Sequence, residues 1–233
     1  VIKGYDECNF HHLMKMILNF CTNDLGGFYL DIIKDRQYTT QTDSLARRSA
    51  QSALFHISHA MVRWVSPILS FTSEEVWQYL PGASSESIFL QTWYEDLEGD
   101  FKNHSIEVAR DINIYLRKEL EQMRRDKVIG SSLDAEVDIY CNDDTYQALL
   151  ELKSELRFVF ITSEARIHSL VEKPTDAVEI DKSLAIRVKQ SNHEKCVRCW
   201  HHREEIGENN LHKELCSRCI ENVLGEGEIR VFA

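Results

Sequence analysis

Two closely spaced cysteine pairs near the C-terminal end constrain the fold of this chain more than any other feature. Two residues separate Cys196 from Cys199 and Cys216 from Cys219, and sixteen residues lie between the pairs. Each Cys-x-x-Cys turn aims two sulfur atoms at one point, and a hairpin that joins two such turns completes a tetrahedron. The spacing therefore predicts a zinc ribbon. Its four thiolates leave no open coordination position, so one structural Zn²⁺ is expected.

Other interpretations of the cysteine tail remain open at this level. Two disulfides would need an oxidising compartment, whereas the chain has seven cysteines, an odd number, and does not open with a signal peptide. Iron also suits a tetrahedral sulfur site. A nearby histidine could replace one cysteine ligand, and the candidates are His193, His201, His202 and His212.

Hydrophobic periodicity predicts an all-α region over the first 128 residues. Apolar side chains recur at spacings of three and four over residues 9–36, 43–65 and 106–127. Short connections between these segments favour an antiparallel helical bundle.

Local signals predict where these helices begin, bend and end. Gly26 and Gly27 are expected to break or kink the first helix, and Pro67 to end the second. Thr72 and Glu75 have the spacing of a capping box, which predicts the start of a shorter third helix.

The hydrophobic period changes from helical to alternating after Ser131. Apolar and polar residues alternate over 133–140, which predicts a half-buried strand. A helix from Asp143 and strands over 158–162, 166–170 and 184–188 complete a small α+β unit. The chain is thus predicted to be mostly α, with a helical bundle over 1–128, an α+β unit over 129–190 and the zinc ribbon over 191–233.

The charge balance limits the partners. Twenty-seven basic and 38 acidic residues give a net charge of −11, which argues against a protein that coats nucleic acid indiscriminately. The apolar stretches are far shorter than the ~20 residues of a membrane helix, so no membrane partner is expected. Any grip on nucleic acid must come from local basic patches.

Three helical stretches together resemble a known RNA-binding domain. They are Phe28–Tyr38 (FYLDIIKDRQY), Arg47–Leu54 (RRSAQSAL) and Ser66–Trp77 (SPILSFTSEEVW). The combination is similar to the anticodon-binding helical domain of the class I aminoacyl-tRNA synthetases for isoleucine, valine, leucine and methionine.

The cysteine tail carries a second resemblance. Lys195–His201 (KCVRCWH), Leu215–Ile220 (LCSRCI) and Gly227–Ala233 (GEIRVFA) look like the C-terminal zinc peptide of bacterial isoleucyl-tRNA synthetases, a finger shared with formamidopyrimidine-type DNA glycosylases. Lys127–Ala135 and Glu155–Ser163 are similar to the junction region of the same synthetases. The resemblance therefore runs over nearly the whole chain, in the same order.

The resemblance implies a C-terminal piece of a longer ligase. The ATP-binding signatures of class I synthetases are absent, so no catalytic residue is expected here. ATP and Mg²⁺ would bind only in the missing catalytic domain, which attaches isoleucine to tRNA. The implied partners are tRNA(Ile) and the catalytic and editing domains of the same polypeptide, in a cytoplasmic monomer that serves protein biosynthesis.

Basic and aromatic residues in the two matching regions are the candidate RNA contacts. Arginine and lysine meet phosphates, and aromatic rings stack on unpaired bases. The candidates are Lys34, Arg36, Tyr38, Arg47 and Arg48 in the helical region, and Arg198, Trp200 and Arg218 in the tail. For each arginine the alternative is an intramolecular salt bridge, and for Tyr38 it is a packed loop aromatic.

Two other functions compete with tRNA recognition. The tail could be a stand-alone zinc-ribbon module that binds nucleic acid, or the chain could be a protein-interaction scaffold, which its acidity would favour. The residues upstream of the tail speak against a glycosylase, because their motifs match the synthetases.

Overall fold

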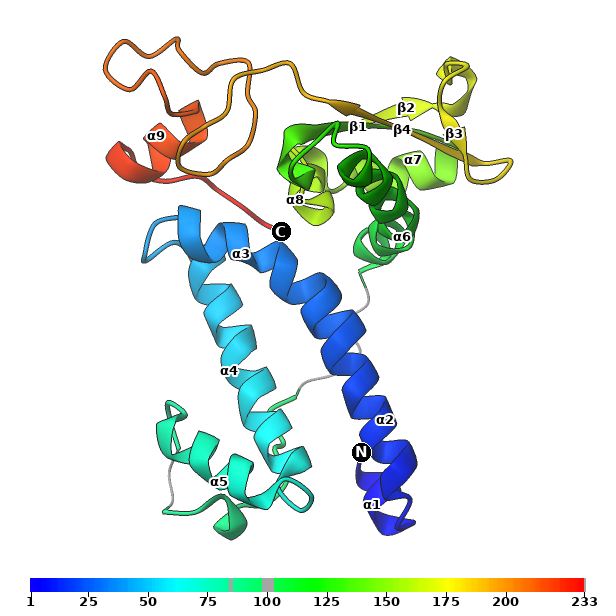
Figure 1. The fold of residues 1–233 in the computed structure, drawn as a ribbon. Helices are drawn as coiled ribbons and strands as arrows, with labels where there is room; N and C mark the ends of the chain where they lie inside the picture. The colour runs from blue at the N-terminus through cyan, green and yellow to red at the C-terminus, as the bar shows by residue number, and fades with distance from the viewer. Residues whose placement is uncertain (84–85, 98–102, 233) are drawn as a thin grey trace.

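A computed structural model describes residues 1–83, 86–97 and 103–232. The chain is elongated, with a pair of long helical arms at one end and a small sheet and the cysteine-rich tail at the other (Figure 1). It is mostly helical, with one four-stranded mixed sheet and a four-cysteine cluster, as the sequence predicts. None of the described helices is both long and apolar enough to cross a membrane.

The first arm opens with the short helix α1 (Ile2–Asp6), which a turn at residues 7–9 separates from the rest. A continuous helical rod follows, made of α2 (Phe10–Asn19), the π-helical segment η1 (Phe20–Tyr29) and α3 (Leu30–Thr39). Gly26 and Gly27 do not break the rod between α2 and α3. A Cβ atom at either position would lie 2.9 Å from a backbone oxygen, that of Cys21 or Thr22. The two glycines therefore permit the wide turn of η1, and the predicted break is a local widening instead.

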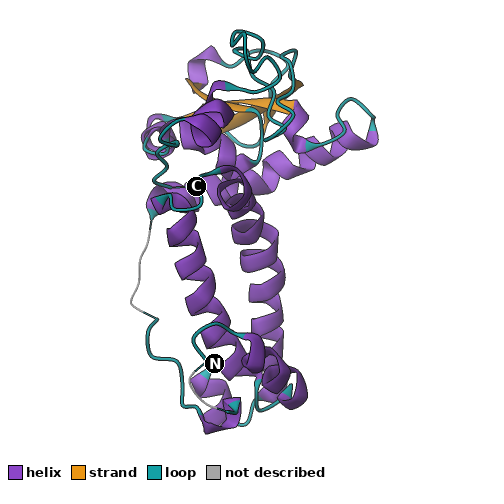
Figure 2. Cartoon of the chain, turned by 90° about the vertical axis from the view of Figure 1, so that its left-hand side faces the viewer, coloured by secondary structure: helices purple, strands orange, loops and turns teal. Residues whose placement is uncertain are grey.

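The second arm is α4 (Leu45–Val65), which leads into α5 (Ser70–Tyr79). Ser44 caps α4, since its side chain accepts a hydrogen bond from the backbone N–H of Arg47 at 3.3 Å. The predicted capping box of Thr72 and Glu75 is wrong, because α5 begins two residues before Thr72. The short helix η2 (Ile88–Leu90) follows, and Figure 2 shows the two arms side by side over much of their length.

Helix α6 (His104–Arg125) belongs by its packing to the sheet end of the molecule. It contacts α7 (Asp143–Leu150), α8 (Leu156–Phe160) and β4 (Leu184–Gln190). Its buried face, which carries Ala109, Ile112, Leu116 and Leu120, is the one that the periodicity predicts. The bundle arrangement of residues 1–128 and the boundary after residue 128 stay predictions.

The sheet has the strand order β2-β1-β4-β3. Strand β1 (Ala135–Cys141) runs parallel to β2 (Glu164–Ser169) and antiparallel to β4, while β3 (Val178–Glu179) forms the edge. The expectation of a half-buried β1 is wrong, since all seven of its residues are buried. Glu136 and Asp138 are covered because charged side chains of the neighbouring strands reach over them, among them Arg166, His168 and Lys189.

The apolar run at 158–162 is a helix rather than the predicted strand. Helix α8 buries Leu156, Phe158, Val159 and Phe160, and it ends at Ile161, whose backbone adopts the left-handed conformation (φ 57°). In a short run that is apolar throughout, the spacing of apolar residues does not distinguish a buried strand from a buried helix, which explains the error.

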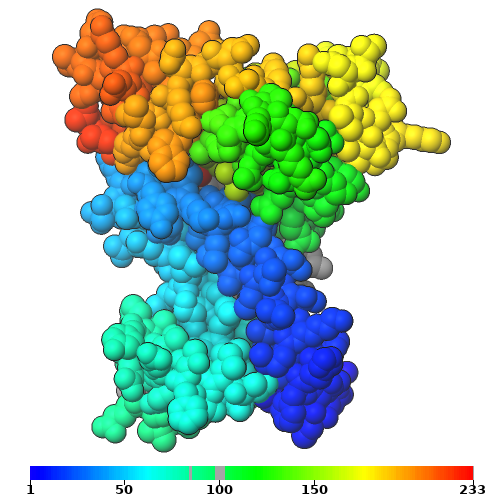
Figure 3. All heavy atoms as spheres, in the orientation of Figure 1, coloured from blue at the N-terminus to red at the C-terminus, as the bar shows by residue number. Residues whose placement is uncertain are grey.

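The cysteine tail returns the chain to the helical arms. A bridge between Lys195 and His202 flanks its first cysteine turn, and its last element is α9 (Ser217–Leu224), which the sequence reasoning missed. The C-terminal peptide then runs between α3 and α8 (Figure 1). Its backbone amides at Val231 and Phe232 donate hydrogen bonds of 2.7 Å to the buried carboxylate of Glu155. The space-filling view shows the tail seated on the end of the helical arms (Figure 3).

Candidate metal centre and nucleic-acid interface

The four tail cysteines converge on one point. The sulfur atoms of Cys196, Cys199, Cys216 and Cys219 all lie within 4.8 Å of one another, and all four residues are buried. The first pair sits on a tight turn, which is closed by a 2.9 Å hydrogen bond from the Trp200 N–H to the Cys196 carbonyl. The second pair begins α9, with Cys216 as its N-cap. Each pair is thus held by local backbone geometry before any metal is considered.

The surroundings of the sulfur atoms favour negative charge. Arg198 donates to the Cys219 sulfur at 3.6 Å, and the backbone N–H of Cys216 donates to the Cys196 sulfur at 3.4 Å. The pKa of Cys199 is lowered because the other three thiols donate hydrogen bonds to its thiolate, that of Cys196 first. The pKa of Cys219 is raised, because its thiol donates hydrogen bonds to the sulfur atoms of the other three, that of Cys196 first. Four thiolates at this spacing need a cation between them.

A tetrahedral metal ion fits this donor set. No disulfide joins any cysteines among the described residues, and the cluster contains four sulfur atoms without a histidine ligand. His201, one of the alternative ligands, instead faces the Cys199 carbonyl at 3.3 Å. A closed Cys₄ shell suits a structural Zn²⁺, which supplies folding energy rather than chemistry.

Thiol reactivity provides a direct test of the four ligands. We expect chelation of the metal to raise the number of rapidly reacting thiols by four, because the tail cysteines are shielded only while they are bound. Cys141 should stay slow in both states, since burial raises its pKa to about 11. The exposed Cys8 should react in both states. Mass spectrometry after brief alkylation counts the thiols, and an unchanged count after chelation would contradict the assignment.

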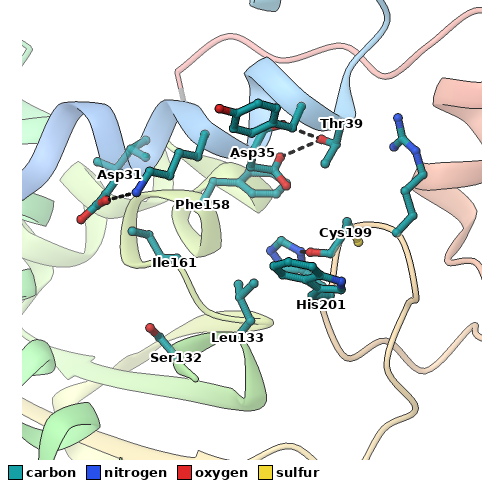
Figure 4. Close-up of a pocket in the computed structure, with 14 residues that line it drawn as sticks. Asp31, Asp35, Thr39, Ser132, Leu133, Phe158, Ile161, Cys199 and His201 are labelled. Atoms are coloured by element: carbon teal, nitrogen blue, oxygen red, sulfur yellow. Dashed lines mark hydrogen bonds and ion pairs between the residues drawn. The ribbon is translucent and has the colours of Figure 1, made fainter. Parts of the chain in front are cut away.

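A cavity of about 630 Å³ lies between α3 and the first cysteine turn. Its walls come from three segments that are far apart in the sequence: α3, the turn Arg198–His201, and the sheet unit with Leu133 and Phe158. Figure 4 shows Asp31, Asp35 and Thr39 along one side of the cavity and Cys199 and His201 on the other.

Four of the predicted RNA contacts line this cavity. Tyr38 and Trp200 are 78 % and 60 % exposed, far more than packed aromatic residues are, so the packed alternative for Tyr38 does not apply. Lys34 is exposed, although it forms an ion pair of 2.7 Å with Asp31. Arg198 is half-buried at the cavity wall. The fold thus gathers two aromatic rings and two cations from segments more than 150 residues apart.

Two predicted contacts require correction. Arg36 is only 8 % exposed, and burial lowers its pKa. The side chain of Arg218 is 9 % exposed and forms a bidentate pair with Asp35, at 2.6 and 2.9 Å. Both guanidinium groups face the interior, so the prediction that they touch RNA is not supported by their positions.

The remaining two candidates lie on α4, outside the cavity. Arg48 is exposed, 4.0 Å from Asp43, whereas Arg47 is half-buried and donates to the Thr40 carbonyl at 3.5 Å. Their role in RNA binding stays a prediction. The sequence reasoning missed Phe158 and Ile161 as cavity residues, because it assigned them to a strand.

Comparison with known proteins places the fold in a class. Residues 1–139, more than half of the chain, match the family described as the anticodon-binding domain of tRNA ligase. Residues 194–222 match the zinc finger found in FPG and IleRS. The chain therefore belongs to the anticodon-binding domain family of tRNA ligases, as the resemblance implied.

The similar individual proteins are isoleucine–tRNA ligases. That of Ruthia magnifica subsp. Calyptogena magnifica is 60 % identical over 233 residues, which cover all of this chain and 25 % of the relative. That of Nitrosococcus oceani is 52 % identical over 239 residues, covering all of this chain and 25 % of the relative. The chain thus spans about a quarter of the length of the curated relatives that it matches.

Proposed function

We propose that this chain is the tRNA-recognition part of an isoleucine–tRNA ligase and binds the anticodon stem-loop of tRNA(Ile). The catalytic and editing domains would belong to the same polypeptide, a cytoplasmic monomer. The catalytic domain would bind ATP and Mg²⁺ and attach isoleucine to the tRNA. No step of that reaction falls on residues of this chain, whose part is to hold the substrate and to set its identity.

The observation that carries this proposal is the cavity between α3 and the cysteine turn. Bases of a single-stranded loop can be splayed out and stacked on aromatic rings, while lysine and arginine meet the phosphates. Tyr38 and Trp200 offer two exposed rings, and Lys34 and Arg198 offer cations beside them. The acidic remainder of the chain would disfavour RNA that lacks the matching loop.

One zinc ion would support this site without contacting RNA. Held by Cys196, Cys199, Cys216 and Cys219, it would fix the turn that carries Arg198 and Trp200. The competing function, a stand-alone zinc-ribbon module, gains no support from the family matches, because the larger match lies in the helical region.

Binding of two RNA stem-loops tests the proposal. We expect the zinc-loaded chain to bind the isoleucine anticodon stem-loop more tightly than one with a swapped anticodon. Trp200→Ala and Tyr38→Ala should each weaken cognate binding by about 10-fold, because loss of one base–aromatic stack costs about 1–3 kcal/mol. Fluorescence anisotropy measures both dissociation constants.

Tyr79→Ala is the matched control for Tyr38→Ala. Tyr79 is 82 % exposed on α5, away from the cavity, so its loss should leave the affinity unchanged. Equal affinity of the wild-type chain for both stem-loops would refute anticodon recognition.

A further inference from the structure

At the wall of the cavity, which Asp35 lines, four charged side chains from three segments form one ionic cluster, which we call the clasp (Asp35, Arg218, Glu228 and Arg230). Asp35 of α3 receives the bidentate pair from Arg218 of α9 and an additional contact from Arg230 of the C-terminal peptide. Glu228 completes the cluster, 3.2 Å from Arg218 and 3.8 Å from Arg230. The clasp therefore joins the first helical arm to the tail and to the C-terminal peptide.

The clasp is almost closed to solvent. The side chains of Arg230 and Arg218 are 1 % and 9 % exposed, and the Arg230 guanidinium lies 3.6 Å from the centroid of the Phe158 ring on α8. Burial acts to raise the pKa of Asp35, but the hydrogen bonds and charges of the two arginines outweigh it and hold that pKa well below its usual range. Because a buried charge without its partner is costly, the members fix one another's positions.

The clasp ties together the two walls of the RNA cavity. On α3, Asp35 follows Lys34 directly and lies one helical turn before Tyr38. In the tail, Arg218 stands between Cys216 and Cys219, and Arg198 donates to the Cys219 sulfur. A short chain of contacts thus leads from α3, the wall of the cavity that carries Tyr38, to the cysteine turn, the wall that carries Trp200.

Other contacts anchor the tail without touching these walls. Arg203 pairs with Glu164 at 2.7 Å, and Lys195 pairs with Asp134 at 3.2 Å. Both attach the tail to the sheet unit and not to α3. Loss of the clasp should therefore leave the tail docked on the sheet unit. The distance between α3 and the cysteine turn would then no longer be fixed by the clasp.

We propose that Asp35, Arg218 and Arg230 are positioning residues for RNA recognition, which set the spacing of Tyr38 and Trp200 so that a splayed anticodon base fits between the two walls. This rests on the proposed function. The two arginines of the clasp lie outside the cavity lining and do not touch the RNA themselves. They act through α3 and the cysteine turn, and they couple the order of the zinc module to the selectivity of the cavity.

Arg230→Met tests the proposal in the zinc-loaded chain, because it removes the charge at similar length. We expect one zinc per chain as in the wild type, cognate affinity reduced at least 10-fold, and a cognate-to-swapped affinity ratio that falls toward one. Arg230→Lys, which keeps the charge, should restore part of that ratio. Glu121→Gln, in an exposed ion pair of α6, is the control and should change nothing.

The ¹⁹F NMR signal of fluorotryptophan at position 200, assigned with Trp200→Phe, reports the cavity without RNA. We expect this signal to shift or broaden in Arg230→Met and to stay unchanged in Glu121→Gln. A folded, zinc-loaded Arg230→Met chain with wild-type signal and wild-type affinity ratio would overturn the proposal. If Arg230→Met does not fold, Asp35→Asn is judged by the same two measurements. If the wild-type chain binds the cognate and the swapped stem-loop equally, the proposed function is refuted instead. The NMR comparison alone then decides whether the clasp positions Trp200.

Discussion

Substitution with serine of Cys216, one of the four proposed zinc ligands, is expected to unfold the tail and to abolish selective RNA binding. Metal binding supplies about 10–16 kcal/mol of apparent folding free energy in small zinc modules. The few apolar contacts around this cluster do not compensate for the loss of that free energy. Around the sulfur atoms, the partly buried hydrophobic residues that pack on the cluster in the described part of the chain are Ile206 and Leu215. Without the metal, the turn that carries Arg198 and Trp200 loses its conformation. One wall of the cavity is then no longer formed.

The measurement combines amide hydrogen exchange with RNA binding. Protection of residues 195–224 should disappear in Cys216→Ser, while β1 and α6 keep theirs, because their core includes none of the four tail cysteines. The cognate dissociation constant should rise at least 10-fold, since at least one stacking contact is lost. Cys8→Ser, at an exposed cysteine outside the cluster, is the control. Metal-free chain that binds the cognate stem-loop as tightly as loaded chain would contradict this account.

Local patterns of sequence were enough to predict the four-cysteine cluster and the long helices. The Cys-x-x-Cys turns are closed by bonds within four residues, and the buried face of α6 follows from its own periodicity. In both cases the information and the structure lie in the same short segment. No distant partner can override it.

Where distant segments decide the structure, the sequence reasoning failed. Sequence alternation places the carboxylate of Glu136 on a solvated strand face, but Arg166, thirty residues later, covers it. The sequence predicts Arg218 to be a free cation, but Asp35, 183 residues earlier, binds it. Periodicity describes one element at a time, so it contains no signal for either pairing.

The cavity shows the same limit for function. Lys34, Arg36 and Tyr38 are close in sequence and were all predicted to touch RNA, but Arg36 is buried while the other two line the cavity. On a helix, residues two apart do not share a face. Which face of α3 points toward Trp200 depends on the docking of the tail, which the clasp fixes.

Loss of the Glu136 carboxylate is expected to destabilise the sheet unit strongly. Its side chain is 5 % exposed, accepts a hydrogen bond of 2.9 Å from Arg166 and receives another of 2.7 Å from Ser191. Breaking a buried ion pair costs about 3–5 kcal/mol, because the remaining charge has no partner. Arg166 is 36 % exposed and keeps Asp138 at 3.8 Å as a second partner, so we expect at most about 3 kcal/mol for Glu136→Ala.

Urea denaturation of the zinc-loaded chain measures this free energy of unfolding. Glu136→Gln should lose less, because the amide keeps the shape and one acceptor for Ser191 or Arg166. Glu179→Ala is the matched surface control, since Glu179 pairs with Lys173 at a site where its side chain is 66 % exposed, and such pairs contribute only about 0–1 kcal/mol. Equal losses for Glu136→Ala and Glu179→Ala would show that water, and not Arg166, solvates the carboxylate of β1. The burial of β1 would then not explain why its polar residues are tolerated in the centre of the sheet.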